Sequence, residues 1–454
     1  MNITRKDFLK LGLMGGAGLA LPIGAWQTAR SRIRGAQAVV SPKVKPFAVP
    51  LPVPPALKPI RADATTDYYE ITQKKGRAEI LPGMETEVWG HNGIFPGPTI
   101  EARSGRRVII RQTNELPTPV SVHLHGGVTP PESDGYPTDL ILPTRDPSHP
   151  GHGHGAEAWT FSRGFKDYEY PNEQRAATLW YHDHRMDFTG PQNYRGLSGF
   201  YIIRDEVEDG LPLPQGEKEV PLMIADRIFK GEGSFYYPSI DPTLEGQPGV
   251  LGEYHKGVFG DTVLVNGAPW PTMEVSNTKY RFRILNASNA RVYELALDPP
   301  PPHGKPFVQV GSDGGLLSAP ISHERVRISP AERFDVVIDF SRYRVGTEVT
   351  LKNLFGKWSW TSRKEGQTSE VMRFRVAREE KDESAIPGRL APDLDFPDPE
   401  EAEVRREFDV FGSALGMFTI NEKVFDHYGL TFDPSPEELL ESEMRRRWAA
   451  REAQ

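Results

Sequence analysis

Two His-X-His pairs are the residues of this 454-residue chain whose type and spacing best suit chemistry. His123 and His125 flank one leucine, and His182 and His184 flank one aspartate. Because residues i and i+2 of a β-strand point to the same face, each pair can present two imidazoles side by side. Neutral imidazole is a ligand for copper, zinc or iron. One such pair is a weak signal, but two pairs with glycine or aromatic neighbours predict a metal site.

The other histidines carry weaker signals. A glycine-containing segment with His149, His152 and His154 could hold copper or zinc, although we interpret it as a solvated loop. Three more are scattered without ligand spacing and are expected at the surface or in caps: His255, His303 and His323.

Composition excludes several classes of protein. The chain has no cysteine, so it can form neither disulfides nor a Cys-ligated metal site from its own residues. The formal charge of −8 gives no basic surplus for a nucleic-acid partner. The 43 glycines and 42 prolines favour many turns and an all-β build over long helices.

The first 38 residues resemble an export signal of the twin-arginine type, with lysine in the second place. Arg5 and Lys6 precede an apolar stretch at 11–25, and Ala36-Gln37-Ala38 is a cleavage candidate. The stretch is too short and too rich in glycine for a stable membrane span. We therefore expect a periplasmic or extracellular protein, with an uncleaved N-terminal anchor as the alternative.

Short alternating runs separated by turns dominate the rest of the chain and predict β-sandwiches. A proline-rich strap at 39–63 precedes a first domain at 64–205, with a strand expected at 108–114. A second domain follows at 215–378, with strands expected at 220–225, 280–285, 326–328 and 334–338. An acidic linker at 379–407 leads to a final piece at 408–454, which holds one strand-like stretch at 416–421 and a charged tail.

The motifs around the histidines resemble those of multicopper oxidases, in the branch of bacterial spore-coat laccase, bilirubin oxidase and phenoxazinone synthase. The resemblance runs from about Ala64 to Val376. Its most specific segments are His123-Leu124-His125-Gly126, Ser133-Asp134-Gly135-Tyr136-Pro137, Trp180-Tyr181-His182-Asp183-His184, Val263-Leu264-Val265-Asn266-Gly267 and Pro330-Ala331-Glu332-Arg333-Phe334-Asp335.

The resemblance implies tandem cupredoxin-like Greek-key β-sandwiches with a remnant of a third, and copper as the cofactor. In that family eight histidines hold a trinuclear cluster, four of them from the first domain. Carried over by motif, His123 would bind the type 2 copper, and His125, His182 and His184 the type 3 pair. Asp134 matches an acid near the cluster that can assist proton delivery, and a simple turn residue is the equal alternative. We interpret Asp183 as a solvated spacer.

The sequence also departs from the family pattern. The family's third domain supplies a His-x-x-His-x-His motif and a His-Cys-His motif, and neither occurs here. The chain therefore reads as an oxidase interrupted near Asp426, with half of the trinuclear ligands and without type 1 copper ligands. The ancestral substrates would be phenolic, aminophenolic or bilirubin-like molecules. Two alternatives remain open: an inactive exported copper-binding or scaffold protein, and a half-enzyme that needs a separate third-domain polypeptide.

Two expectations concern the end of the chain. The strand at 416–421 is predicted to lack sheet partners and to leave an unpaired edge. Deletion of everything after about Glu379 is predicted to change stability by no more than ~1 kcal/mol, because little packed structure is expected there.

Overall fold

The computed structural model describes residues 39–145, 159–186, 188–237, 257–355, 368–391, 399–412 and 418–421. The predicted export signal at 1–38, the segment with His149, His152 and His154, and most of the charged tail lie outside the described residues. Among the described residues, none of the helices is long and apolar enough to cross a membrane. Contacts within the chain group residues 41–454 as one compact unit.

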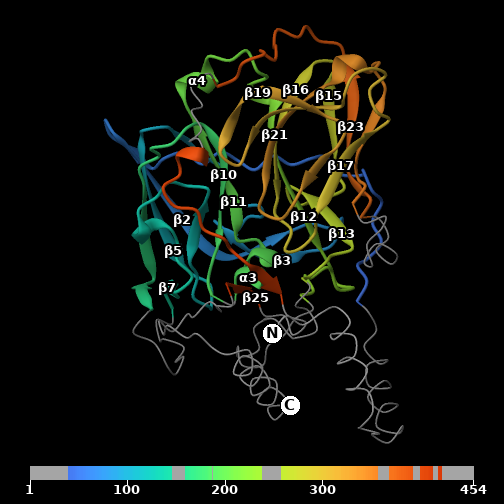
Figure 1. Cartoon of the computed structure of the whole chain (residues 1–454). Helices are drawn as coiled ribbons and strands as arrows, with labels where there is room; N and C mark the ends of the chain where they lie inside the picture. Colours follow the sequence, from blue (N-terminus) through green and yellow to red (C-terminus); the bar gives the residue numbers. More distant parts are fainter. Residues whose placement is uncertain are drawn as a thin grey trace, which may run out of the picture. The chain divides into compact units, whose positions relative to one another are not determined.

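Residues 61–204 contribute two sheets that pack face to face around one core. The first sheet has the order β1-β2-β5-β9, with β3 also paired to β2, and the second has the order β4-β11-β10-β6. Figure 1 shows β10 beside β11 and β2 beside β5. The strand bounds are β1 (Arg61–Ala62), β2 (Thr66–Ala78), β3 (Thr86–His91), β4 (Ile100–Arg103), β5 (Arg107–Asn114), β6 (Val122–His125), β9 (Phe165–Tyr170), β10 (Ala177–Asp183) and β11 (Ser198–Arg204). A separate pair joins β7 (Asp139–Leu142) to β8 (Thr160–Arg163).

Residues 219–378 contribute a second sandwich, with one sheet of seven strands and one of five. The sheet orders are β14-β13-β12-β16-β21-β18-β19 and β15-β23-β22-β17-β20. The strand bounds are β12 (Glu219–Arg227), β13 (Thr262–Val265), β14 (Ala268–Pro269), β15 (Thr272–Ser276), β16 (Lys279–Asn286), β17 (Tyr293–Asp298), β18 (Phe307–Ser312), β19 (Gly315–His323), β20 (Val326–Ile328), β21 (Arg333–Asp339), β22 (Glu348–Asn353) and β23 (Glu370–Arg378).

Within the described residues, helical segments are short and occupy connections. They are α3 (Thr189–Arg195), α4 (Glu206–Asp209), and the 3-10 turns η1 (Pro131–Ser133), η3 (Gly216–Lys218), η6 (Phe340–Arg342) and η7 (Pro399–Glu401). The all-β prediction of sandwiches is therefore confirmed, and its cause is visible in β5, where buried and more exposed side chains alternate along the strand. Such alternation lets one face of a strand join the core while the other remains polar.

The two sandwiches are joined by apolar and polar contacts. Trp180 and Phe200 of the first sandwich share a buried cluster with Met223 and Leu285 of the second. The proline-rich strap runs along both, since the Phe47 N–H donates to the Trp270 carbonyl at 2.8 Å and the Leu57 N–H donates to that of Thr99 at 2.8 Å.

The segment after β23 is packed rather than loose. Leu390 and Ala391 are fully buried against Val310 and Val337 of the second sandwich and against Leu213 of the segment that precedes it. The Ala385 N–H donates to the Pro212 carbonyl at 2.7 Å, and the Leu390 N–H donates to that of Ser318 at 2.9 Å. The expectation that little packed structure follows Glu379 is therefore wrong.

The strand expected at 416–421 is β25 (Phe418–Ile420), and it has a partner. It pairs in antiparallel fashion with β24 (Val410–Gly412), so that Val410 lies opposite Ile420. The prediction that this strand lost its sheet partners is wrong, because the acidic segment before it returns as a strand of its own. Val410 and Ile420 remain exposed.

Candidate metal centre

The two His-X-His pairs lie on neighbouring antiparallel strands, β6 and β10. Val122 and Leu124 of β6 point into the core of the first sandwich, so His123 and His125 point to its opposite face. On β10, Leu179 and Tyr181 belong to that core, whereas Trp180 and His182 face the other way. The register places His182 opposite His123 and Trp180 opposite His125. Alternation and register together bring the imidazoles to one patch.

The ring nitrogens of three histidines converge. One nitrogen each of His123, His125 and His182 lie within 4.8 Å of one another. His125 Nδ1 and His182 Nε2 are 3.4 Å apart. The His184 ring is close by, with its centroid 5.0 Å from that of His123 and 5.6 Å from that of His182. The structure therefore gathers all four predicted ligands, with His184 slightly outside the tightest group.

Backbone carbonyls fix which nitrogen two of the rings offer. His123 Nδ1 donates to the Asp134 carbonyl at 2.5 Å, and His182 Nδ1 donates to the Asp183 carbonyl at 2.8 Å. In the neutral form of either ring, this hydrogen bond leaves Nε2 as the nitrogen that can bind a metal ion. His125 differs, because its Nδ1 is the atom that faces His182.

Burial favours the neutral form of His125, His182 and His184. It lowers the pKa of His125 to about 4, with a further contribution from the Arg333 guanidinium. Burial also lowers the pKa of His182 well below its usual range, and lowers that of His184. At neutral pH these three imidazoles are unprotonated, which is the form that binds metal ions.

Aromatic and small residues shape the surroundings. The Trp180 indole stacks on the His182 ring at a centroid distance of 4.1 Å and on the His125 ring at 5.3 Å. Gly126 follows His125 with a φ of +89°, and a Cβ there would lie 2.6 Å from the Arg333 guanidinium. Arg333 in turn donates to the Thr178 carbonyl of β10 at 3.0 Å, so the second sandwich braces the strand that carries His182.

Comparison with known proteins identifies the family. A family model described as multicopper oxidase matches residues 72–208. A laccase of Bacillus subtilis (strain 168) is 39% identical over 383 residues, which cover 76% of this chain and 68% of the laccase. A bilirubin oxidase of Albifimbria verrucaria is 34% identical over 426 residues, covering 89% of this chain and 67% of the oxidase. The McoA multicopper oxidase of Aquifex aeolicus superposes with a TM-score of 0.67 at 30% identity, covering 82% of this chain and 74% of McoA.

The chain belongs to the multicopper oxidase family. Copper is the metal that this family implies, and the donor set fits it. Unprotonated imidazoles suit copper, and the converging ring nitrogens of His123, His125 and His182 would hold it. The Nδ1 protons of His123 and His182 are taken up by backbone carbonyls.

In this multicopper oxidase chain Asp134 stands beside His123 and also ends a turn. Its carboxylate Oδ1 lies 3.4 Å from His123 Nδ1 and its side chain is 48% exposed. Its backbone N–H closes the η1 turn on the Pro131 carbonyl at 3.3 Å. Gly135 then turns the chain with a φ of +71°, where a Cβ would lie 2.2 Å from the Val122 carbonyl oxygen. Asp134 is therefore both a turn residue and an acid beside a predicted ligand, so the two alternatives given for it are compatible.

Asp183 is a residue whose importance the sequence interpretation missed. It is not a solvated spacer, because it is only 1% exposed. Its carboxylate accepts the N–H groups of Ser121 and Arg185, each at 3.1 Å, and burial raises the pKa of this carboxyl to about 7. The signal was present, because a residue between two ligands on one face of a strand must point to the opposite face, toward the core.

The remaining described histidines lie elsewhere. His303 is exposed, and His323 pairs with the Gln309 side chain at 2.9 Å. His91 of β3 is fully buried and meets the edge of the Tyr181 ring at a centroid distance of 4.7 Å. His255 lies outside the described residues.

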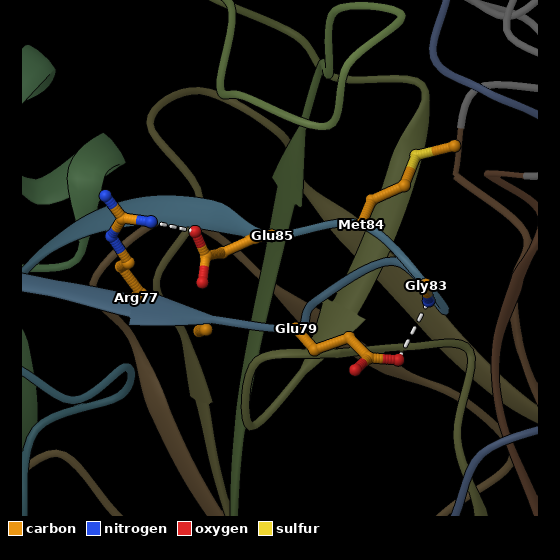
Figure 2. Close-up of a pocket in the computed structure, with 6 residues that line it drawn as sticks. Arg77, Glu79, Gly83, Met84 and Glu85 are labelled. Carbon is orange, nitrogen blue, oxygen red and sulfur yellow. Dashed lines mark hydrogen bonds and ion pairs between the residues drawn. The ribbon is translucent and has the colours of Figure 1, made fainter.

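A hollow of about 220 Å³ lies at the turn between β2 and β3, lined by Arg77, Ala78, Glu79, Gly83, Met84 and Glu85. Figure 2 shows its two carboxylates turned to separate partners. Glu85 pairs with Arg77, and Glu79 accepts the Gly83 N–H at 2.8 Å. Because both acids are already paired, this hollow offers no converging ligands comparable to the histidine centre.

Proposed function

We propose that this chain binds copper at His123, His125, His182 and His184, as the first-domain half of an oxygen-reducing copper cluster. The observation that carries the proposal is the convergence of three imidazole nitrogens within 4.8 Å, with the fourth ring adjacent. Following the family motif, His123 is assigned to the type 2 position and the other three to the type 3 pair.

Each residue has a defined task in this proposal. The copper, when bound, would supply one-electron chemistry and the reduction of oxygen. His123 and His182 offer Nε2 because their Nδ1 protons are held by backbone carbonyls. Asp134, half-exposed beside His123, is placed to hold a proton between solvent and the centre. Trp180 covers one side of the rings and limits access of water.

Oxidation of a substrate needs a further component. In the family, electrons enter through a copper held by cysteine, and these 454 residues contain no cysteine. We propose that oxidation of phenolic, aminophenolic or bilirubin-like molecules requires a separate polypeptide that supplies the remaining cluster histidines and the cysteine ligand. Residues 1–38 are proposed to direct export to the periplasm or beyond.

The second candidate function is an exported copper-binding or scaffold protein without turnover. The absence of cysteine favours it, because no copper–thiolate bond can form within these residues. Measurement of oxygen consumption distinguishes the half-enzyme from the binding protein. The chain is mixed with copper, a phenol and a polypeptide carrying the His-x-x-His-x-His and His-Cys-His motifs. Consumption that depends on both polypeptides supports the half-enzyme, and none supports the binder.

Copper binding itself is tested by equilibrium dialysis. The wild type is compared with the His123→Ala/His182→Ala double variant and with a control double variant, His303→Ala/His323→Ala. We expect the control to hold copper like the wild type and the first variant to lose it. Unchanged copper content in the first variant would overturn the assignment and point to His149, His152 and His154.

A further inference from the structure

Asp183 ties the two ligand-bearing strands together from the core side. Its Oδ2 accepts the N–H of Ser121, the residue immediately before β6, at 3.1 Å. Its Oδ1 accepts the N–H of Arg185, the residue after His184, at 3.1 Å. One buried carboxylate therefore holds both the beginning of the His123–His125 strand and the turn that follows His184.

A further hydrogen bond joins Ser121 to the end of β10, and in this one Ser121 is the acceptor. The His184 N–H donates to the Ser121 carbonyl at 2.8 Å. Ser121 is thus held by Asp183 through its N–H and by His184 through its carbonyl. His182 is held by its pairing with His123 in the sheet, but His184 lies one residue beyond the end of β10. The contacts through Ser121 and Asp183 hold His184 instead.

The backbone of Asp183 is fixed just as firmly. Its carbonyl accepts His182 Nδ1 at 2.8 Å and the Asn193 amide at 3.0 Å. Its N–H is shared between the Asn193 side-chain oxygen at 3.0 Å and the Leu197 carbonyl at 3.0 Å. The carbonyl that sets the tautomer of His182 is therefore immobilised by α3 and the residues after it.

We propose that Asp183 is the positioning residue of the histidine centre, setting the orientation of His182 and His184 relative to His123. The inference rests on the proposed copper function for its purpose, although the geometry it describes exists without metal. A carboxylate is required because two N–H groups meet two acceptor oxygens. An asparagine would offer one acceptor and direct a donor at the other N–H, leaving it unpaired in the core.

The test compares Asp183→Asn with a matched control, Asp205→Asn. Asp205 also accepts two backbone N–H groups, from Glu208 at 2.7 Å and Ala176 at 2.8 Å, but at the far end of β10. Each variant is examined metal-free by NMR of the histidine rings, which reports tautomer and surroundings. Each is then titrated with Cu²⁺, with nitrogen couplings in the electron paramagnetic resonance spectrum as the measure of ligation.

We expect Asp183→Asn to shift the ring signals of His182 and His184 and to weaken copper binding about 10- to 100-fold. Asp205→Asn should leave both readouts at the wild-type values. A folded Asp183→Asn protein with wild-type ring signals and copper affinity would overturn the positioning role. A wild type that binds no copper would instead remove the proposed function, while the metal-free NMR still decides the role of Asp183.

A second variant covers the case in which Asp183→Asn does not fold. Asn193→Ala removes both side-chain contacts to the Asp183 backbone but leaves the carboxylate in place. Because the Asn193 amide also lies 3.4 Å from His182 Nδ1, the His184 ring is the informative signal in this variant. A shift in the His184 ring signals supports the proposal, because the Asp183 backbone, and with it the carboxylate that holds the Arg185 N–H, is then released. Unchanged His184 ring signals would overturn it.

Discussion

Both sandwiches carry polar side chains at alternate positions of a strand, and the arginine pair of the second meets surroundings opposite to those of the histidine pairs of the first. In the second sandwich, Arg281 and Arg283 of β16 are almost fully buried among carboxylates. Arg281 Nε donates to Asp335 at 2.9 Å, and both guanidiniums donate to Glu208, at 2.5 and 2.6 Å. Arg283 also donates to Glu219 at 2.5 Å.

In the first sandwich the paired histidines face one another instead. His125 Nδ1 and His182 Nε2 are 3.4 Å apart, and burial lowers the pKa of both rings. The arginines are paired with carboxylates of the same chain, whereas the histidines face other histidines. The comparison teaches that alternate polar residues on a strand stabilise the fold when oppositely charged partners surround them, and that converging imidazoles without such partners form the site for which we propose copper.

The largest loss of stability is expected at the buried arginine site, to which the comparison assigns a purely structural role. Glu208→Ala would leave two buried guanidiniums without one shared carboxylate, and should lower the free energy of unfolding by about 3–5 kcal/mol. Urea denaturation measures this, with Glu206→Ala, exposed on the same short helix α4, as a control expected within ~0.5 kcal/mol. A loss as small as the control's would mean that Arg281 and Arg283 do not depend on Glu208.

A smaller loss is expected from Leu390→Ala. Leu390 is fully buried in the cluster with Leu213 and Val337, so truncation removes packed atoms and leaves a cavity. We expect a loss of about 2–4 kcal/mol by urea denaturation, with copper binding unchanged in the same protein. Wild-type stability would show that the segment after Glu379 is dispensable.

Much of the fold follows from short apolar or alternating runs separated by turns in the sequence. The strands expected at 220–225 and 280–285 lie within Glu219–Arg227 and Lys279–Asn286. The ends were missed because the flanking polar residues, such as Arg227, are buried by specific partners that the pattern does not reveal. Leu390 was missed for a related reason, since one apolar residue in an acidic segment shows no periodicity. The pairing of β24 with β25 likewise depends on a chain reversal that the sequence does not mark clearly.

The sequence indicated which four histidines would gather, and it indicated less of the geometry in which they do so. The spacing of His123, His125, His182 and His184 indicated the shared faces, but the register that sets His182 opposite His123 is a property of the sheet. Asp183 was misread although alternation points it to the core. The residue type suggested solvent, and only the positions of the Ser121 and Arg185 N–H groups show why a carboxylate is tolerated there.

His91 offers a contrast to the four converging histidines, because it is fully buried and lies outside their group. Burial lowers its pKa to about 3, against an ordinary value near 6.5. Below about pH 6.5 the unfolded chain takes up a proton that the folded chain does not, so this residue reduces stability as the pH falls toward 3. His91→Phe should therefore narrow the difference in unfolding free energy between pH 7.5 and pH 4.5 by about 2–3 kcal/mol. An unchanged difference, measured by urea denaturation, would contradict the assignment of a neutral buried ring.

The smallest effect on stability is expected at the metal centre itself. His125 is partly exposed, stacks on Trp180 at a centroid distance of 5.3 Å, and faces His182 rather than a carboxylate. In metal-free protein, His125→Ala should therefore change the free energy of unfolding by no more than about 1 kcal/mol. The same substitution should abolish most of the stabilisation that added copper gives the wild type, because a ligand that binds only the folded state raises its stability. Thermal denaturation with and without Cu²⁺ measures both quantities. A large loss in the metal-free protein would place His125 with Arg281 among the residues that hold the fold, and the distinction between the two polar pairs would fail.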